Sequence, residues 1–209
     1  MSDPTFYVET PSLFISYLQP SNDAHCDFLV ALYNTPEFIA SIGGSPTSIV
    51  TREVARKVLA GRFRDEHERN GYGTYLVSLK NEDGNGEEGD KLAALQAAVP
   101  IGTIGLMRGE EPDRYPAPDI GFAMLTEYMR KGYTKEAALG IMEYLEREKG
   151  VKDVFGFCDR KNVASKAVLR SIGLEDRGEW PLRVFGGEIS AVWTKKGMHG
   201  DFGPGGYGL

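Results

Sequence analysis

The residues best suited to chemistry form a short basic loop that directly precedes a long amphipathic stretch. The loop consists of Arg130, Lys131, Gly132, Tyr133, Thr134 and Lys135. The first backbone N–H groups of a helix have no partner within it, and the helix dipole adds partial positive charge there. Gly132 permits a close backbone approach or a positive φ, and the basic side chains add further charge. The loop therefore predicts an anion-binding site, with an ordinary capped turn as the alternative.

Two elements must position this loop. The run DIGFAML at 119–125 predicts a strand before it. Helical periodicity over residues 134–149 gathers Ala137, Ala138, Ile141, Met142 and Leu145 on one face. The loop contains neither GxxxxGK[ST] nor GxGxxG, so the nucleoside triphosphate and NAD fingerprints are missing. A nucleotide-phosphate domain of unrelated fold is kept only as a minor alternative.

The remaining pattern predicts a single domain of alternating strands and helices over residues 8–196. Further strands are expected at 12–18, 73–79, 100–107 and 154–158, and a final pair at 182–185 and 188–194 around Gly186 and Gly187. Further helices are expected at 24–34, 37–42, from the cap Thr51 to Asn70, and from the cap Asn162 to Ile172. The acidic, Gly-rich segment 81–90 predicts a solvated loop, and the tail 197–209, with six glycines, predicts disorder.

Composition excludes several classes of protein. The chain has 209 residues, is 41% hydrophobic and carries a net charge of −6, so a broad nucleic-acid-binding face is not expected. Cys26 and Cys158 lack a metal-ligand pattern, which favours a reducing compartment and no metal site. No signal peptide or membrane-length apolar run is visible, so the predicted location is the cytoplasm. The basic residues at 52–69 alternate with acidic ones, so this helix face is expected to be solvated. The three histidines, including His67, are also expected to be solvated.

Several ordered blocks carry a resemblance to a known family. They are Asp119-Ile120-Gly121-Phe122, the run from Glu127 to Ala137, Asn162-Val163-Ala164-Ser165, the run from Ser171 to Glu175, Glu9-Thr10-Pro11-Ser12-Leu13 and the run from Pro100 to Leu106. Together they resemble the signature of the GCN5-related N-acetyltransferases (GNAT). Within that family they are most similar to the branch of the ribosomal-protein alanine N-acetyltransferases (RimJ/RimL-like).

The resemblance implies an α/β fold with a mainly antiparallel, splayed sheet flanked by helices, and acetyl-CoA as cosubstrate. It implies that backbone groups of Phe122, Ala123, Met124 and Leu125 bind the acetyl carbonyl and the pantetheine arm. It assigns the pyrophosphate to the backbone N–H groups of Arg130, Lys131, Gly132, Tyr133, Thr134 and Lys135. It further implies that Asn162 contacts pantetheine and that Ser165 lies near the sulfur.

The sequence departs from the family pattern at Ser12, which stands where the first strand often carries Arg, and at three further positions. Met129 lacks the polar side chain that usually opens the loop, and Thr134 replaces a small residue. Because backbone N–H groups do most of the binding in such a loop, we expect weaker affinity rather than none. Leu169 stands where many members carry the Tyr that protonates the departing thiolate.

Amide formation from a thioester needs a neutral amine, a donor for the oxyanion and a proton for the thiolate. The resemblance implies direct attack through a tetrahedral intermediate, without a covalent enzyme intermediate. We predict Asp119 as the general base, with a solvent-facing strand-end carboxylate as the alternative. We predict Ser165 as the group that serves the thiolate, with a first-turn helix serine as the alternative. Glu188 is a weaker candidate for orienting the amine.

The sequence thus predicts an acetyl-CoA-dependent N-acetyltransferase acting on a primary amine, either a small amine or a protein N-terminus. The alternative is a CoA-binding sensor or interaction module of the same fold without catalysis. The missing Tyr and the altered loop favour the alternative, whereas Asp119, Asn162 and Ser165 favour the enzyme.

Overall fold

The computed structural model describes residues 3–81, 91–112 and 114–198. Within them, eight strands form one sheet in the order β1-β2-β3-β4-β5-β6-β8-β7. The strands are β1 (Tyr7–Glu9), β2 (Leu13–Ser16), β3 (Thr74–Leu79), β4 (Val99–Met107), β5 (Asp119–Met124), β6 (Phe155–Asp159), β7 (Leu174–Leu182) and β8 (Glu188–Lys195). The helices are α1 (Asp23–Tyr33), α2 (Pro36–Ser41), α3 (Arg52–Val58), α4 (Arg64–Asn70), α5 (Lys91–Ala97), α6 (Tyr133–Lys149) and α7 (Val163–Ser171).

The sheet consists of two antiparallel halves that separate between β5 and β6. Strands β1 to β5 pair antiparallel in sequence order, and β6, β8 and β7 form the second antiparallel group. The only neighbours that run parallel are β5 and β6, and a single residue pair, Asp119 with Phe155, joins them among the described residues. Beyond this pair the two strands diverge. The predicted mixed α/β fold with a mainly antiparallel, splayed sheet is therefore confirmed.

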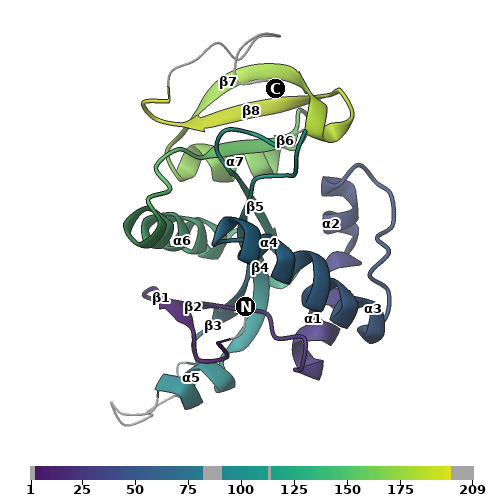
Figure 1. Ribbon diagram of the computed structural model, residues 1–209, viewed down its shortest axis with the longest axis vertical. Helices are drawn as coiled ribbons and strands as arrows, with labels where there is room; N and C mark the ends of the chain where they lie inside the picture. The colour runs from purple at the N-terminus through teal and green to yellow at the C-terminus, as the bar shows by residue number, and fades with distance from the viewer. Residues whose placement is uncertain (1–2, 82–90, 113, 199–209) are drawn as a thin grey trace.

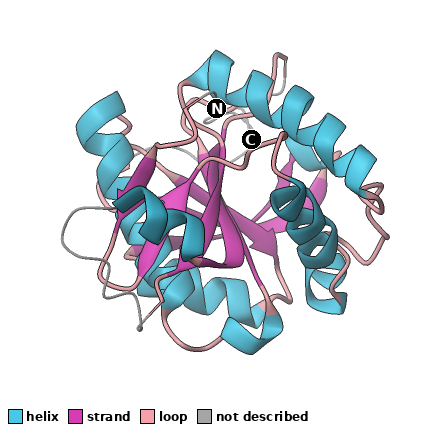
Figure 2. Cartoon of the chain, turned by 90° about the horizontal axis from the view of Figure 1, so that it is seen from below, coloured by secondary structure: helices cyan, strands magenta, loops and turns pink. Residues whose placement is uncertain are grey.

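Helices cover both faces of the sheet. Figure 1 shows α6 on one side of the central strands and α1, α2 and α3 on the other, and Figure 2 shows the sheet enclosed between them. Strand alternation accounts for the two layers, because successive side chains point to opposite faces. On β3, Tyr75 and Val77 belong to the core beneath α6, whereas Leu76 packs with Leu29 of α1 and with Leu59, which follows directly after α3.

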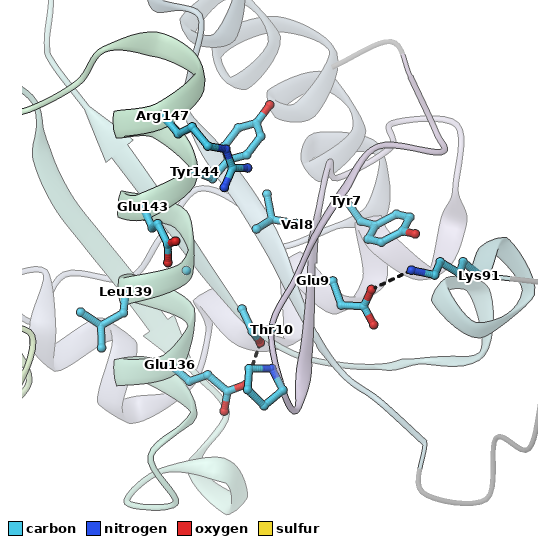
Figure 3. A pocket seen from close by; sticks show the side chains of 12 residues that line it. Tyr7, Val8, Glu9, Thr10, Lys91, Glu136, Leu139, Glu143, Tyr144 and Arg147 are labelled. Atoms are coloured by element: carbon cyan, nitrogen blue, oxygen red, sulfur yellow. Dashed lines mark hydrogen bonds and ion pairs between the residues drawn. The ribbon is translucent and has the colours of Figure 1, made fainter. Parts of the chain in front are cut away.

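The N-terminal end of α6 is fixed by a clamp to the turn between β1 and β2. Glu136 Oε1 accepts hydrogen bonds from Thr10 Oγ1 at 2.6 Å and from the Ser12 backbone N–H at 2.7 Å (Figure 3). A carboxylate in the first helical turn also complements the helix dipole. One turn further along, Gly140 lets the same β-turn pack closely, because a Cβ there would lie 2.6 Å from Thr10 Cγ2. The clamp thus sets where the loop before α6 lies.

Most predicted elements are present, and local signals explain their ends. Thr51 and Asn162 cap α3 and α7 through their side-chain oxygens, and Gly71 ends α4 in a left-handed conformation. The predicted strand at 182–185 is wrong, because Arg183–Phe185 forms a 3-10 turn and the partner of β8 is the longer strand β7. Strands β7 and β1 and helix α5 have no counterpart in the sequence prediction.

One residue of the predicted tail is buried in the core. Met198, which the sequence analysis assigns to the tail, is buried with Tyr115 and Phe155. The rest of that tail, 199–209, and residues 82–90 of the predicted acidic loop lie outside the described residues. In the described part of the chain, no helix combines the length and the apolar character needed to cross a membrane.

Candidate active site

The loop before α6 presents a run of unpaired backbone N–H groups. Arg130 and Gly132 both adopt the left-handed conformation, with φ of 60° and 89°. In the described part of the chain, none of the N–H groups of residues 130–135 donates to a protein acceptor, and the first to do so is that of Glu136, to Gly132 O at 3.0 Å. Left-handed φ is uncommon for a residue other than glycine and concentrates at functional sites. Several N–H groups at one helix N-terminus form a binding site for a phosphate anion.

The open edge of β5 leads directly into this loop. The Leu125 N–H donates to Ile101 O of β4, so the odd-numbered residues along β5 direct their backbone groups toward β4. The Phe155 N–H of β6 donates to Pro118 O, so the even-numbered residues direct their backbone groups toward β6. Phe122 and Met124 therefore point their N–H and C=O groups into the splay, where β6 has already diverged.

The four strand residues that the resemblance assigned to acetyl and pantetheine binding differ in where their backbone groups point. Ala123 faces β4, where it pairs with Thr103. The Leu125 N–H is bonded to Ile101 and its C=O accepts from the Tyr128 N–H at 2.9 Å, so its backbone is already engaged. Only Phe122 and Met124 of this set keep backbone groups directed at the gap. The alternation along one strand is the physical reason for the difference.

Asn162 and Ser165 lie on the other side of the gap, at the start of α7. Asn162 Oδ1 accepts the Ser165 backbone N–H at 2.9 Å and thereby caps the helix. Within the described residues, the Ser165 hydroxyl has no hydrogen-bond partner. Helix α7 follows β6 and lies beside α6 (Figure 1). The fold therefore brings together three predicted segments: the β5 edge, the loop before α6 and the first turn of α7.

Asp119 occupies the last paired position before the strands separate. It is partly buried, and loss of hydration raises the pKa of its carboxyl group to about 7, with a smaller contribution from the negative charge of Glu66. Burial disfavours the charged form of a carboxyl group, and a nearby like charge does the same. A group that titrates near neutral pH is suited to accept a proton. The alternative of a solvent-facing carboxylate does not describe this environment.

Glu66 on α4 carries a negative charge that acts on Asp119, and the sequence analysis did not single it out. Burial raises the pKa of its carboxyl group to about 7, although Arg69 and Arg62 act in the opposite direction. The sequence analysis assigned this segment to a solvated face because its charges alternate. The signal was present in the spacing, because Glu66 lies three residues after the buried Phe63 and so continues the apolar stripe.

His67, four residues after Phe63, shows the same effect, and the prediction that it is solvated is wrong. Its side chain is 6% exposed, Nε2 lies 2.9 Å from Thr74 O, and Tyr17 and Tyr75 contact the ring edge-on. Burial lowers the pKa of the imidazole to about 4. His67 is therefore a neutral packing residue that holds α4 against β3.

Leu169 fills the position to which the resemblance assigns a proton-donating Tyr. The side chain is 1% exposed and packs over Gly156 of β6, where a Cβ would lie 2.5 Å from Leu169 Cδ2. This position therefore supplies no proton donor. Cys158, on the same strand, is also no substitute, because burial raises the pKa of its thiol to about 11.

A groove of about 650 Å³ lies elsewhere, between β1 and the outer face of α6 (Figure 3). Its charged lining has both signs, and Glu9 is already paired with Lys91 at 3.3 Å. The groove contains none of the free N–H groups at 130–135 and does not reach the β5 edge. We therefore place the candidate active site at the splay and not in this groove.

The comparison with protein families decides the assignment. A family model described as an acetyltransferase (GNAT) domain matches residues 17–175. The chain belongs to the GNAT acetyltransferase family. The matched region of this GNAT protein includes the β5 edge, the loop before α6 and the start of α7.

Individual relatives are more distant. The uncharacterized N-acetyltransferase YnaD of Bacillus subtilis (strain 168) is 33% identical over 60 residues, which cover 29% of this chain and about a third (35%) of that protein. Ribosomal-protein-S5-alanine acetyltransferase from Vibrio fischeri has a TM-score of 0.66 at 15% identity, over 91% of this chain and 96% of that one. The RimL ribosomal L7/L12 alpha-N-protein acetyltransferase, solved with coenzyme A, has a TM-score of 0.65 at 15% identity, over 91% and 97%. At these identities the two structures show a common fold.

Proposed function

We propose that this GNAT protein is an N-acetyltransferase that moves an acetyl group from acetyl-CoA to a primary amine. The observation that carries the proposal is the run of six unpaired backbone N–H groups at 130–135, which continues from the open edge of β5. A diphosphate fits the first feature, and an extended amide-bearing arm fits the second. The coenzyme A bound to RimL supports the proposal by analogy of fold.

In this proposal different residues bind different parts of acetyl-CoA. The loop N–H groups hold the pyrophosphate, with Arg130 and Lys131 adding positive charge. Phe122 and Met124 bind the acetyl carbonyl and the pantetheine amides along the strand edge, and Asn162 contacts the arm from α7. Acetyl-CoA supplies the activated thioester, and no metal is required for the transfer.

The chemistry then requires a proton acceptor and a place for the leaving thiolate. The amine nitrogen forms a bond to the acetyl carbon, the carbon–sulfur bond breaks, and the proton of the amine passes to Asp119 directly or through water. The free N–H of Phe122 is the candidate donor to the carbonyl oxygen while it carries negative charge. The unpartnered Ser165 hydroxyl is the candidate hydrogen-bond donor to the thiolate. The proton taken up from the amine returns to the thiolate through solvent or through Ser165, which is reprotonated in turn, so that sulfur leaves as the CoA thiol and the base is regenerated.

One observation favours a second candidate function, a CoA-binding module without catalysis. Leu169 is buried over Gly156, so the phenolic acid of many relatives has no counterpart here. Ser165 is the only residue placed to serve the thiolate in our proposal. The two candidates differ in turnover and agree on binding.

Calorimetric titration of acetyl-CoA tests the cofactor first. We expect the wild type to bind with a Kd of about 10 μM and Gly132→Asp to weaken binding at least about thirtyfold, because a carboxylate then faces the pyrophosphate. Gly150→Asp is the matched control, since Gly150 has a left-handed φ and open surroundings at the other end of α6. We expect the control to change Kd less than about twofold. Absence of heat and of thermal stabilisation at millimolar acetyl-CoA would contradict the proposal.

Turnover separates the enzyme from the binding module. A panel of primary amines is assayed by release of free CoA thiol in the wild type and in Ser165→Ala. We expect turnover in the wild type and a loss of about tenfold or more in kcat for the variant. Tight binding of acetyl-CoA with no thiol release above the buffer rate, for any amine, establishes the non-catalytic module instead.

A further inference from the structure

A hollow beside the candidate site is lined by two arginines. It measures about 520 Å³ and lies in the connection between β4 and β5, lined by Arg108, Glu111, Arg114, Tyr115 and Pro116. Because β4 and β5 pair up to Met107 and Asp119, this hollow begins where the candidate base is placed. Nothing in the proposed handling of acetyl-CoA uses it.

Arg108 is held rigidly by its own connection. Its Nε donates to Tyr115 O at 2.9 Å and one terminal nitrogen donates to Pro116 O at 2.6 Å. The guanidinium also contacts the Tyr72 hydroxyl, and Tyr72 is 5% exposed. An arginine whose geometry is fixed in advance loses little conformational entropy when it binds an anion.

Arg114 lies in the same hollow without a partner of opposite charge. In the described part of the chain it forms no ion pair, and its buried Nε has no hydrogen-bond acceptor. A buried donor without an acceptor is costly, and a charged donor more so. A carboxylate or phosphate in the hollow satisfies this donor with a charge-assisted hydrogen bond.

The Tyr72 hydroxyl is influenced both by the arginines of the hollow and by Glu66. The positive charges of Arg108 and Arg114 act on its hydroxyl from one side, and the negative charge of Glu66 acts on it as well. Glu66 in turn acts on Asp119. The geometric link is the Met107–Asp119 pair, which the hollow with Arg108, Arg114 and Glu111 follows directly along the chain. Glu66 acts electrostatically on both Tyr72 and Asp119, so negative charge lies on the Asp119 side and the two arginines lie on the other.

We propose, on the basis of the proposed function, that the acceptor is an amine that also carries an anionic group. The anionic group, a carboxylate or a phosphate, binds Arg114 and Arg108 in the hollow, while the amine lies between Glu66 and Asp119. Glu66 is a positioning residue that attracts the ammonium form, and Asp119 takes its proton. A plain alkylamine satisfies only one of the two subsites.

Matched acceptor pairs test the proposal. Phosphoethanolamine is compared with ethanolamine, and β-alanine with propylamine, by thiol release in the presence of saturating acetyl-CoA. We expect the charged member of at least one pair to have a kcat/KM about tenfold higher or more, and the better pair distinguishes phosphate from carboxylate.

Variants locate the preference. Arg114→Gln is expected to lower kcat/KM about tenfold for the charged acceptor, mainly through KM, and less than about twofold for its plain partner. Arg147→Gln is the control, because Arg147 is exposed on α6 and pairs with Glu148. Thermal melts confirm that each variant is folded. Equal kcat/KM values for both members of both pairs, or a preference that Arg114→Gln leaves unchanged, overturn the proposal.

A binding measurement keeps this proposal separate from the proposed function. Phosphoethanolamine and β-alanine are titrated into the CoA-saturated protein, with and without Arg114→Gln. Binding that depends on Arg114, without turnover of any amine, supports the acceptor subsite and contradicts the transferase. Turnover of plain amines without preference does the reverse. No binding of either anionic amine overturns the subsite whatever the turnover.

Discussion

At the scale of single residues, two carboxyl groups have raised pKa values at or near the candidate site. Asp119 and Glu66 lie on different elements, and burial raises the pKa of each to about 7. Burial is the main cause at both positions, and the negative charge of Glu66 adds a smaller rise at Asp119. A carboxyl group that titrates near neutral pH offers a base to an amine, and a negative charge close by attracts an ammonium ion.

The first prediction concerns the pH dependence of the reaction. The base acts when it is deprotonated, and its pKa is about 7, so kcat/KM of the wild type is expected to rise up to about pH 7 and then level off. Asp119→Asn is expected to lower kcat about 100-fold and to remove this rise. Asp153→Asn, at an exposed position, serves as the control. A rise that persists in Asp119→Asn would assign the base to another group.

The second prediction concerns His67 and stability. Its pKa falls from 6.5 to about 4 on folding, so the unfolded state binds more protons between these values. The free energy of unfolding therefore contains the full contribution of neutral His67 above pH 6.5. This contribution falls by about 3 kcal/mol as the pH decreases from 6.5 to 4.

Urea unfolding at a series of pH values measures this effect. The difference in unfolding free energy between the wild type and His67→Gln is expected to shrink as the pH falls from 6.5 to 4. The raised pKa values of Asp119 and Glu66 act in the opposite direction, but they are common to both proteins and cancel in the difference. A difference that does not vary with pH would mean that the imidazole is not buried in the neutral form.

At the scale of elements, the third prediction concerns the contact between α6 and the β1–β2 turn. Alanine is favoured over glycine in a helix by about 1 kcal/mol, yet we expect Gly140→Ala to destabilise the protein by a similar amount or more. The added Cβ meets Thr10 Cγ2, and Thr10 cannot rotate freely because its hydroxyl is bonded to Glu136 and Leu13.

Thermal unfolding of three variants tests this explanation. Thr10→Ser in the Gly140→Ala background keeps the hydroxyl and removes the methyl group, so it is expected to restore stability. Gly61→Ala is the control. Gly61 lies in the π-helical turn Leu59–Phe63 that joins α3 to α4, and a Cβ there meets nothing within 4 Å, so this variant is expected to stabilise the protein by about 0.5–1 kcal/mol. Gly140→Ala that melts at or above the wild-type temperature would show that the turn yields to the new side chain.

The elements also show how far sequence alone reaches. The caps Thr51 and Asn162 and the terminating Gly71 act locally, so the sequence locates them correctly. Strand β7 is missed because it contains Gly178 and Pro181, and only its pairing with β8, with a register shift between Asp176 and Glu179, keeps it extended. Glu66 is missed for a related reason, since its burial depends on the sheet that α4 covers.

At the scale of the whole molecule, two groups of strands share one helix and one candidate ligand site. The core beneath α6 includes residues from both groups, such as Leu106 from β4 and Trp193 from β8. Within the described ranges, the two groups of strands pair only at Asp119 and Phe155. A cosubstrate in the gap is therefore expected to connect parts of the sheet that the chain leaves apart.

The fourth prediction uses hydrogen exchange to test this connection. The N–H groups of residues 130–135 have no acceptor among the residues that the structure describes, and those of Phe122 and Met124 face the gap. Free amides exchange rapidly, so saturating acetyl-CoA is expected to slow exchange at these residues about tenfold or more. The β1–β2 hairpin is the internal control and is expected to be unaffected. Equal exchange with and without acetyl-CoA would place the ligand elsewhere.

The single pair between Asp119 and Phe155 makes the splay a wedge whose apex lies at the candidate base. When β5 and β6 move apart, the backbone near their one pair moves least, and Asp119 belongs to that pair. A wider opening for a bulkier acyl chain displaces the far end, near Met124, much more than it displaces the proton acceptor. In the proposed enzyme, a larger acyl group can therefore be accommodated without moving the proton acceptor. Substitutions that broaden the choice of acyl group are expected at the wide end of the gap, near Met124.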